Sequence, residues 1–182
     1  EVEYFNNNRN DARAAHAQRA VQYPSTIATH HAFQGMADRT ELERRNKAIF
    51  AFLVITGARI GAASSLCLKH INLVDGYILQ DGREVRTKAG KTFTTWFFPM
   101  HPDYLACFTS WVNYLRNEKM FGPEDALFPL PERRLVNGKF VFDKVSREIY
   151  SNGSIINEVF KAAFVQVQMQ PYGAHSIRKT LV

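Results

Sequence analysis

The chain of 182 residues has the length of about one domain and a formal net charge of +6. Hydrophobic residues make up 46% of it and aromatic residues 13%, which suffices for a packed core and excludes a wholly disordered chain. The longest unbroken apolar run, residues 48–55, is too short to cross a bilayer, and no basic-then-apolar leader is visible. We therefore expect a cytoplasmic protein with no membrane partner.

The positive charge is compatible with an acidic polymer as partner, although many basic proteins bind none. The two cysteines, Cys67 and Cys107, lack CxxC spacing and lie in apolar stretches. We expect them to be small buried side chains in a reducing compartment, neither a disulfide nor metal ligands.

Both ends of the chain suggest a fragment of a longer protein. The first residue is Glu1 rather than Met, and Val182 closely follows a charged motif that is expected to open a helix. Residues 1–24 are polar and Ala-rich, and we interpret them as a linker or the end of a preceding domain. Residues 25–182 are expected to form the domain that follows.

Helical periodicity is strongest in residues 41–56, whose apolar side chains recur at the spacing of one buried face. Gly57 is expected to end this helix, because glycine accepts the left-handed backbone of a helix C-terminus. Ser25 is a candidate N-cap for an earlier helix that runs to residue 36. Further helices are predicted over residues 60–66, 102–119 and 154–168, and from residue 174 onward.

The segment between residues 71 and 99 has a different pattern, in which turn signals separate short stretches of β-forming residues. The turn signals are Asp75-Gly76, Asp81-Gly82 and Ala89-Gly90. They predict a small antiparallel sheet whose last hairpin carries residues 88–91 at its tip. No element is assigned to residues 122–153. The predicted fold class is therefore α+β and mostly helical, with helices packed with a small antiparallel sheet.

Some side chains are assigned a position by these patterns. Leu105 and Ile155 are expected on the inward faces of their helices, and Ser154 is expected to cap the second of these helices. The aromatic run 96–98 is interpreted as sheet core rather than as a stacking platform for bases. The histidines at positions 16, 30 and 31 are interpreted as solvated helix residues. Because the carboxylates are scattered and no Cys/His cluster is visible, we expect no metal site.

Three separated motifs could carry chemistry. Arg59 follows the buried helix in TGAR, at a tight turn where a guanidinium and helix N-terminal amides can meet an anion; a surface arginine is the alternative. Lys88 lies at the predicted hairpin tip, from which it could deliver a proton, although lysines on exposed turns are common without a function. His175 and Arg178 are one helical turn apart, so a titratable imidazole and a guanidinium would share a face, with chance pairing as the alternative.

Together, the motifs TGAR, TKAGK and HSIR resemble those of the tyrosine recombinases, the phage-type site-specific integrases, in order and in separation. The resemblance covers the chain from about residue 25 to the end, which would be a partial catalytic domain. Residues 1–24 would then be a linker or the end of a preceding DNA-binding domain. The segment Asp125–Pro129 is also similar to a stretch that precedes the later helices of the family.

The resemblance implies site-specific DNA recombination or integration by phosphoryl transfer through a 3′-phosphotyrosine, without a metal or other cofactor. Arg59 and Arg178 would match the two arginines that hold the non-bridging oxygens of the scissile phosphate. His175 would assist proton transfer or steady the phosphate. Lys88 would match the lysine that protonates the departing 5′ oxygen, with Lys91 as a close rival.

Lys91 and Lys179 are expected to contact DNA. The sequence also departs from the family pattern, because Ala62 stands where an acidic residue is usual and Lys179 where a histidine is common. The family nucleophile lies beyond the second arginine, whereas all seven tyrosines here precede Arg178. We therefore expect the nucleophile to lie past Val182 and this fragment alone to be inactive. Tyr172 is expected to be a packing residue.

The expected partners are double-stranded DNA and further copies of the chain assembled on it, in a bacterial or phage mobile element. One alternative is a catalytically dead DNA-binding remnant of an integrase, which Ala62 favours. Others are a helical domain without a nucleic-acid role and a type IB topoisomerase, which shares the catalytic logic. Duplex binding with a steep salt dependence would exclude the domain without a nucleic-acid role.

Overall fold

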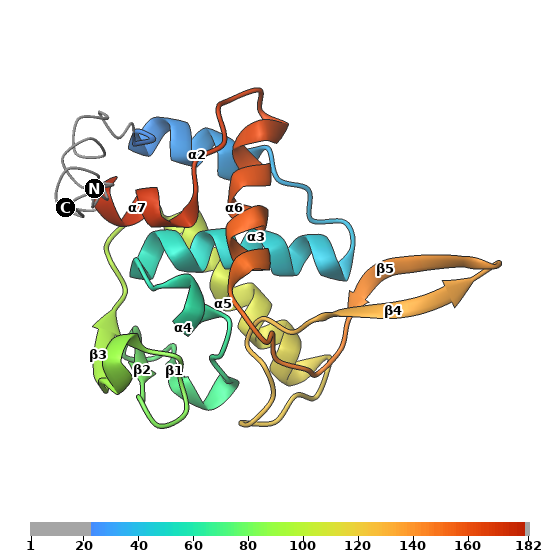
Figure 1. Ribbon diagram of the computed structural model, residues 1–182, viewed down its shortest axis with the longest axis horizontal. Coiled ribbons are helices and arrows are strands. Elements are labelled where there is room, and N and C mark those ends of the chain that lie inside the picture. Colours follow the sequence, from blue (N-terminus) through green and yellow to red (C-terminus); the bar gives the residue numbers. More distant parts are fainter. Residues whose placement is uncertain (1–22, 181–182) are drawn as a thin grey trace, which may run out of the picture.

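The computed structural model describes residues 23–180 (Figure 1). The helices are α2 (Thr26–Gln34), α3 (Glu41–Thr56), α4 (Ile60–Ala63), α5 (Pro102–Asn117), α6 (Ser154–Gln166) and α7 (Ala174–Thr180). The strands are β1 (Ile71–Asn72), β2 (Tyr77–Gln80), β3 (Phe93–Trp96), β4 (Pro131–Val136) and β5 (Lys139–Val145). The predicted α+β class is confirmed. In the described part of the chain, no helix is both long and apolar enough to cross a membrane.

Helix α3 forms the centre of the molecule and has the predicted bounds. At its start, the Thr40 hydroxyl accepts a hydrogen bond from Glu43 N–H, and the Glu43 carboxylate accepts one from Thr40 N–H. Every residue from 48 to 55 is at most 1% exposed, so this half of the helix is enclosed on all sides. Gly57 ends the helix at φ 56°, the left-handed conformation that favours glycine.

Aromatic side chains join α3 to the helices on either side of it. Phe50 stacks on Phe160 of α6, with ring centroids 4.4 Å apart, and Phe52 contacts Phe108 of α5 at 5.2 Å. In Figure 1, α6 crosses in front of α3 and α5 passes behind it. Burial of such rings supplies the largest favourable contribution to folding, so α3 fixes the positions of both neighbours.

The first sheet is antiparallel in the order β1-β2-β3, as predicted. Its last pair is Gln80 with Phe93, so residues 88–91 lie within a long connection and not at the tip of a tight hairpin. The interpretation of residues 96–98 as sheet core is wrong for Trp96 and Phe98, which are 60% and 42% exposed, while Phe97 packs on the core. Alternation along an extended chain explains this, because successive side chains face opposite sides.

Residues 122–153, left without an element by the sequence, contain the β4–β5 hairpin, which projects from the helices (Figure 1). Arg134 and Asp143 form an ion pair across it at 2.8 Å. Phe140 and Phe142 are about half exposed, because the hairpin extends beyond any layer that could cover them. Mixed charge and exposed apolar residues on both strands give no clean alternation, and for this reason the sequence pattern does not predict the hairpin.

The predicted inward faces of α5 and α6 are confirmed except at one position in each helix. Leu105 and Ile155 are 45% and 44% exposed, whereas their neighbours Tyr104 and Ile156 are buried. The buried stripes recur at the 3.6-residue period from these neighbours, so the apolar side chain next to each stripe is left outside. Ser154 is the first residue of α6 and makes no side-chain cap, since Gly153 occupies that position, but Ser25 does cap α2, at 3.1 Å from Ala28 N.

The expectation of buried cysteines outside a disulfide is confirmed for Cys67, while Cys107 is less buried than expected. Cys67 is buried and Cys107 half-buried, and neither forms a disulfide. Burial raises the pKa of Cys67, and it raises that of Cys107 to about 11, so both thiols stay protonated at neutral pH.

A buried carboxylate ties the start of α3 to α5 and to the base of the hairpin. Glu41, 7% exposed, accepts hydrogen bonds from the Tyr114 hydroxyl at 2.5 Å and from Val145 N–H at 2.7 Å, and pairs with Lys119 at 2.9 Å. Burial by itself would raise the pKa of Glu41, but these donors outweigh it and lower the pKa. Burial, and then the hydrogen bond to this carboxylate, raise the pKa of Tyr114 to about 12.

We predict that Glu41→Gln lowers the free energy of unfolding by about 3 kcal/mol at pH 7, because it leaves the buried donors without their charged acceptor. The folded pKa of Glu41 lies below its unfolded value of 4.5, so the carboxylate stabilises the fold fully above pH 4.5 and progressively less as pH falls. Urea unfolding of both proteins from pH 7 to pH 3 should show the difference shrinking toward acid. A difference that is constant with pH would contradict this account.

Candidate active site

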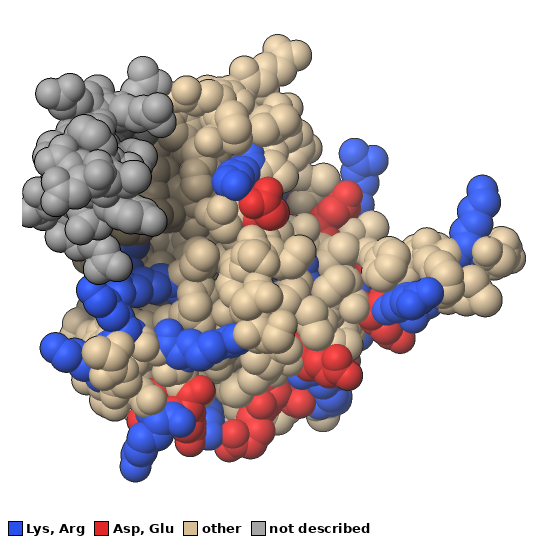
Figure 2. Space-filling model, in the orientation of Figure 1, with Lys and Arg blue, Asp and Glu red and all other residues tan. Residues whose placement is uncertain are grey.

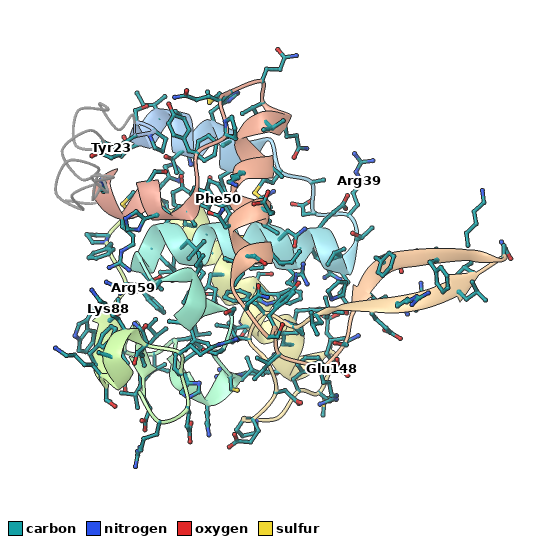
Figure 3. All side chains as sticks on the ribbon, in the orientation of Figure 1. Tyr23, Arg39, Phe50, Arg59, Lys88 and Glu148 are labelled. Atoms are coloured by element: carbon teal, nitrogen blue, oxygen red, sulfur yellow. The ribbon has the colours of Figure 1, made fainter. Side chains whose placement is uncertain are left out.

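A cavity of about 560 Å³ opens where the end of α3, the sheet, the loop between β2 and β3, and α7 meet. Four of the residues that line it are cationic: Arg59, Lys88, Lys91 and Arg178. Figure 3 shows Arg59 and Lys88 next to each other at this side of the molecule. Residues 59, 88 and 178, far apart in sequence, are therefore brought to one place, as the motifs predict.

The turn after α3 positions Arg59. The Thr56 hydroxyl donates to Phe52 O at 2.6 Å and accepts from Ala58 N–H at 3.1 Å, which fixes the chain on both sides of Gly57. Arg59 itself is the N-cap residue of α4, with an extended backbone, so its side chain leaves the helix for the solvent-exposed cavity.

Helix α7 positions Arg178 from the opposite side. Ala174 and Ile177 are at most 2% exposed and anchor the helix in the core, and Ala174 N–H donates to the Asn157 side chain at 3.0 Å. Arg178 follows Ile177 directly and is half-buried at the cavity. The predicted helix start at residue 174 is confirmed.

The electrostatics of the cavity favour an anion. Burial, and then the positive charge of Arg59, lower the pKa of Arg178, which means that the two guanidinium groups are close enough to repel each other. Between residues 23 and 180, no carboxylate pairs with either arginine and no Asp or Glu lines the cavity. Figure 2 shows Lys and Arg side chains gathered here, on the left of the view. Such a site is complementary to a phosphate or sulfate group.

The loop that carries Lys88 is fastened by hydrogen bonds to α4 and by a close contact within itself. Arg86 N–H donates to the Ser65 hydroxyl at 2.9 Å, and its guanidinium donates to Ser64 O at 3.0 Å, which ties the loop to the end of α4. Gly82 lies against Gly90, so closely that a Cβ on Gly82 would meet Gly90 O at 2.0 Å. Lys88 and Lys91 are exposed at the edge of the cavity and reach it from this fixed loop.

The other predicted site residues do not line the cavity. His175 is exposed on α7, one turn before Arg178. Lys179 is also exposed, and its ammonium lies 3.4 Å from the Tyr23 hydroxyl. Tyr172 contacts the Phe164 ring, with centroids 5.1 Å apart, so its predicted packing role is confirmed.

Four polar side chains of the cavity were not predicted as site residues: Thr56, Gln80, Thr87 and Thr95. Gln80 donates to the Thr95 hydroxyl at 2.8 Å. The hydroxyl oxygen of Thr87 is enclosed and has no hydrogen-bond partner among the described residues. Thr87 is next to Lys88 in the sequence, and this proximity is the one signal that could have identified Thr87 as a site residue. Ala62, in the place where the family has an acid, lines the cavity and is 1% exposed.

Solved structures share this fold. XerA recombinase superposes with a TM-score of 0.63 at 18% identity, over 90% of this chain and 48% of that one. The lambda integrase catalytic core superposes with a TM-score of 0.56 at 15% identity, over 88% of this chain and 84% of that one. The integrase from mycobacterium phage Brujita superposes with a TM-score of 0.54 at 16% identity, over 90% of this chain and 43% of that one. This chain thus has the fold of tyrosine recombinase and integrase catalytic domains, and it spans about half the length of XerA recombinase and of the Brujita integrase.

No family model matches the sequence, and no curated protein matches it either. The fold likeness therefore rests on the arrangement of helices and strands, at 15–18% identity in these three comparisons.

We predict that sulfate stabilises the protein through the two arginines. At constant ionic strength, sodium sulfate should raise the melting temperature of the wild type more than that of Arg59→Ala, because an anion that binds only the folded state stabilises it. Without sulfate, Arg59→Ala should change the free energy of unfolding by less than about 0.5 kcal/mol, since it removes an exposed cation that is repelled by Arg178.

Arg39→Ala is the matched control, because Arg39 is exposed on a different side of the molecule (Figure 3). It should keep the full response to sulfate. An equal response in all three proteins would show that sulfate acts by a general salt effect and not at this cavity.

Proposed function

We propose that this chain is the main part of the catalytic domain of a site-specific DNA recombinase that breaks and rejoins strands through a 3′-phosphotyrosine. The observation that carries the proposal is the convergence of Arg59, Lys88 and Arg178 on one cavity, with both guanidinium groups free of carboxylate partners in the described chain. A scissile phosphate is the anion that this arrangement would hold. The similarity of fold to recombinases and integrases supports the same reaction class.

In this proposal Arg59 and Arg178 bind the two non-bridging oxygens of the phosphate. Negative charge grows on these oxygens as phosphorus becomes five-coordinate, so fixed guanidinium groups stabilise the transition state more than the ground state. By analogy with a lost oxyanion-hole donor, removal of either arginine should cost about 3 kcal/mol of transition-state stabilisation. No metal ion takes part.

The leaving group needs a proton. The tyrosine hydroxyl releases its proton to solvent as its oxygen forms a bond to phosphorus, the bond from phosphorus to the 5′ oxygen breaks, and that oxygen takes a proton from the ammonium of Lys88. The reverse step, with a 5′ hydroxyl of another strand, restores the backbone without an external energy source. Lys91 is the alternative donor, because it lines the same cavity from the same loop. His175, which lies on α7, would assist proton transfer once DNA is bound.

The nucleophile of this proposal comes from outside the described residues. Of the tyrosines at positions 23, 77, 104, 114, 150 and 172, none lines the cavity. The chain alone should therefore bind duplex DNA without cleaving it. Assembly of several copies on DNA is also proposed, supported by the fold similarity to a lambda integrase dimer bound to a COC′ core site, with a TM-score of 0.55 at 16% identity.

A catalytically dead remnant that only binds DNA is the second candidate, and Ala62 favours it. An acidic side chain at this position would orient Arg59, whereas Ala62 offers no polar atom. If the protein is such a remnant, every longer form of the chain should bind DNA and none should form a covalent product with it.

We predict duplex DNA binding with a steep salt dependence. The logarithm of the binding constant should fall linearly with the logarithm of salt concentration, and each of Arg59→Ala and Arg178→Ala should reduce the slope by about 1, because each removes one phosphate contact. Fluorescence anisotropy with a labelled duplex measures this, and Arg39→Ala should leave the slope unchanged. Absence of binding at low salt would refute any nucleic-acid role.

We further predict that a chain extended past Val182 to a tyrosine-bearing helix forms a covalent adduct with a nicked suicide substrate. Arg59→Ala and Arg178→Ala should reduce the adduct rate by at least about 100-fold, which corresponds to the loss of about 3 kcal/mol. Adduct formation at the wild-type rate in either variant would exclude the proposed site. Normal DNA binding with no adduct in the wild type would favour the remnant.

A further inference from the structure

Three candidate metal ligands meet where α2 lies beside the start of α5. His30 comes from α2, while His101 and Asp103 flank Pro102 at the first turn of α5. One ligand atom from each lies within 4.8 Å of the other two. Asp103 Oδ2 is 3.8 Å from His30 Nε2 and 3.4 Å from His101 Nδ1. Within residues 23–180, no other group of three His, Cys, Asp or Glu residues has this spacing.

The spacing suits a first-row transition metal. Bonds of 2.0–2.2 Å in tetrahedral geometry place neighbouring ligand atoms about 3.3–3.6 Å apart. The carboxylate and the two imidazoles are already near these distances, so small rotations of side chains complete the set. Two imidazoles with one carboxylate are a donor set typical of Zn²⁺, and the same nitrogens suit Co²⁺ and Ni²⁺.

One ring nitrogen of each histidine faces the carboxylate of Asp103. His101 Nδ1 carries a lone pair that accepts a long hydrogen bond, 3.3 Å, from Asp103 N–H, and a metal ion would take this lone pair in place of the hydrogen bond. The nitrogen of His30 that faces Asp103 is Nε2, whereas Nδ1 is enclosed without a hydrogen-bond partner among the described residues. The His30 ring is tilted by 36° against that of His101, with centroids 4.1 Å apart. By contrast, His70 has partners on both ring nitrogens, Cys67 N–H and Glu84, as expected of a structural histidine.

We propose that His30, His101 and Asp103 bind one divalent transition-metal ion, Zn²⁺ or a chemically similar ion, outside the arginine cavity. This proposal departs from the expectation of no metal site, and His30, whose side chain is only 22% exposed, is half-buried rather than fully solvated. It escaped the sequence analysis because residue 30 and residues 101–103 are adjacent only in the fold.

The bound ion would act as a clamp between two elements that otherwise share few contacts. It would join α2 to the N-terminus of α5, next to the contact of Phe33 with Tyr104. Asp103 is 51% exposed, so the ion can enter from and return to solvent. The segment that leads to His101 begins at Phe98, which lines the arginine cavity, so the clamp also fixes one wall of that cavity from outside. The proposal stands independently of the proposed function.

Titration of the metal-free 182-residue chain with Co²⁺, followed by its visible d–d absorption, tests the site. We expect saturation at one ion per chain, displacement by Zn²⁺, and a melting temperature that rises with Zn²⁺ concentration, because the ion binds only the folded state. His30→Gln and His101→Asn should each weaken Co²⁺ binding at least about tenfold. Asn keeps the N-cap of α5, so His101→Asn should fold normally.

His31→Gln is the matched control, because His31 is exposed, adjacent to His30 and on the same helix. It should bind Co²⁺ as the wild type does. If His30→Gln fails to fold, the half-exposed Asp103→Asn replaces it, with the same expected loss. Absence of a saturable band, or equal affinity in the ligand variants and the control, would overturn the proposal.

Discussion

The enclosed half of α3 is the constraint on which the candidate site depends. Residues 48–55 are held by α5 and α6 on opposite sides, so the end of the helix at Gly57 cannot shift. Arg59 leaves this fixed end, and α7, which packs on both α3 and α6, places Arg178 beside it. Two unpaired guanidinium groups repel each other, and only the burial of surrounding apolar surface, about 1.5–3 kcal/mol for each large side chain, keeps them together.

The placement of the Arg59 and Arg178 guanidinium groups side by side is informative, because it is unfavourable without a ligand. The buried charge of Glu41, for example, is satisfied by three donors. At the cavity, by contrast, two arginines and two lysines face an opening that contains no carboxylate among residues 23–180. A cavity where four cations gather without a carboxylate among the described residues is suited to an anion that comes from outside.

Much of the fold could be predicted from local pattern. The bounds of α3, its Gly57 terminus and the Ser25 cap follow from helix periodicity and capping chemistry, which act over a few residues. The gathering of Arg59, Lys88 and Arg178 was expected only through the order of three motifs, since no local rule joins residues so far apart. The β4–β5 hairpin and the cluster of His30 with His101 depend on tertiary neighbours, so their sequences carry little signal. His175 was expected at the same site but lies on the exposed side of α7.

The cavity and the His30 cluster are connected by residues 97–101, which leave β3 and open α5 (Figure 1). Phe98 N–H donates to Ile55 O at 2.7 Å, so this segment is itself fastened to the central helix.

The most direct test of the account is a crystal structure of the chain soaked with tungstate, a heavy tetrahedral oxyanion. We predict anomalous density between Arg59 and Arg178, within hydrogen-bond distance of both guanidinium groups. Tungstate bound only elsewhere, or either arginine paired with a carboxylate, would contradict the account.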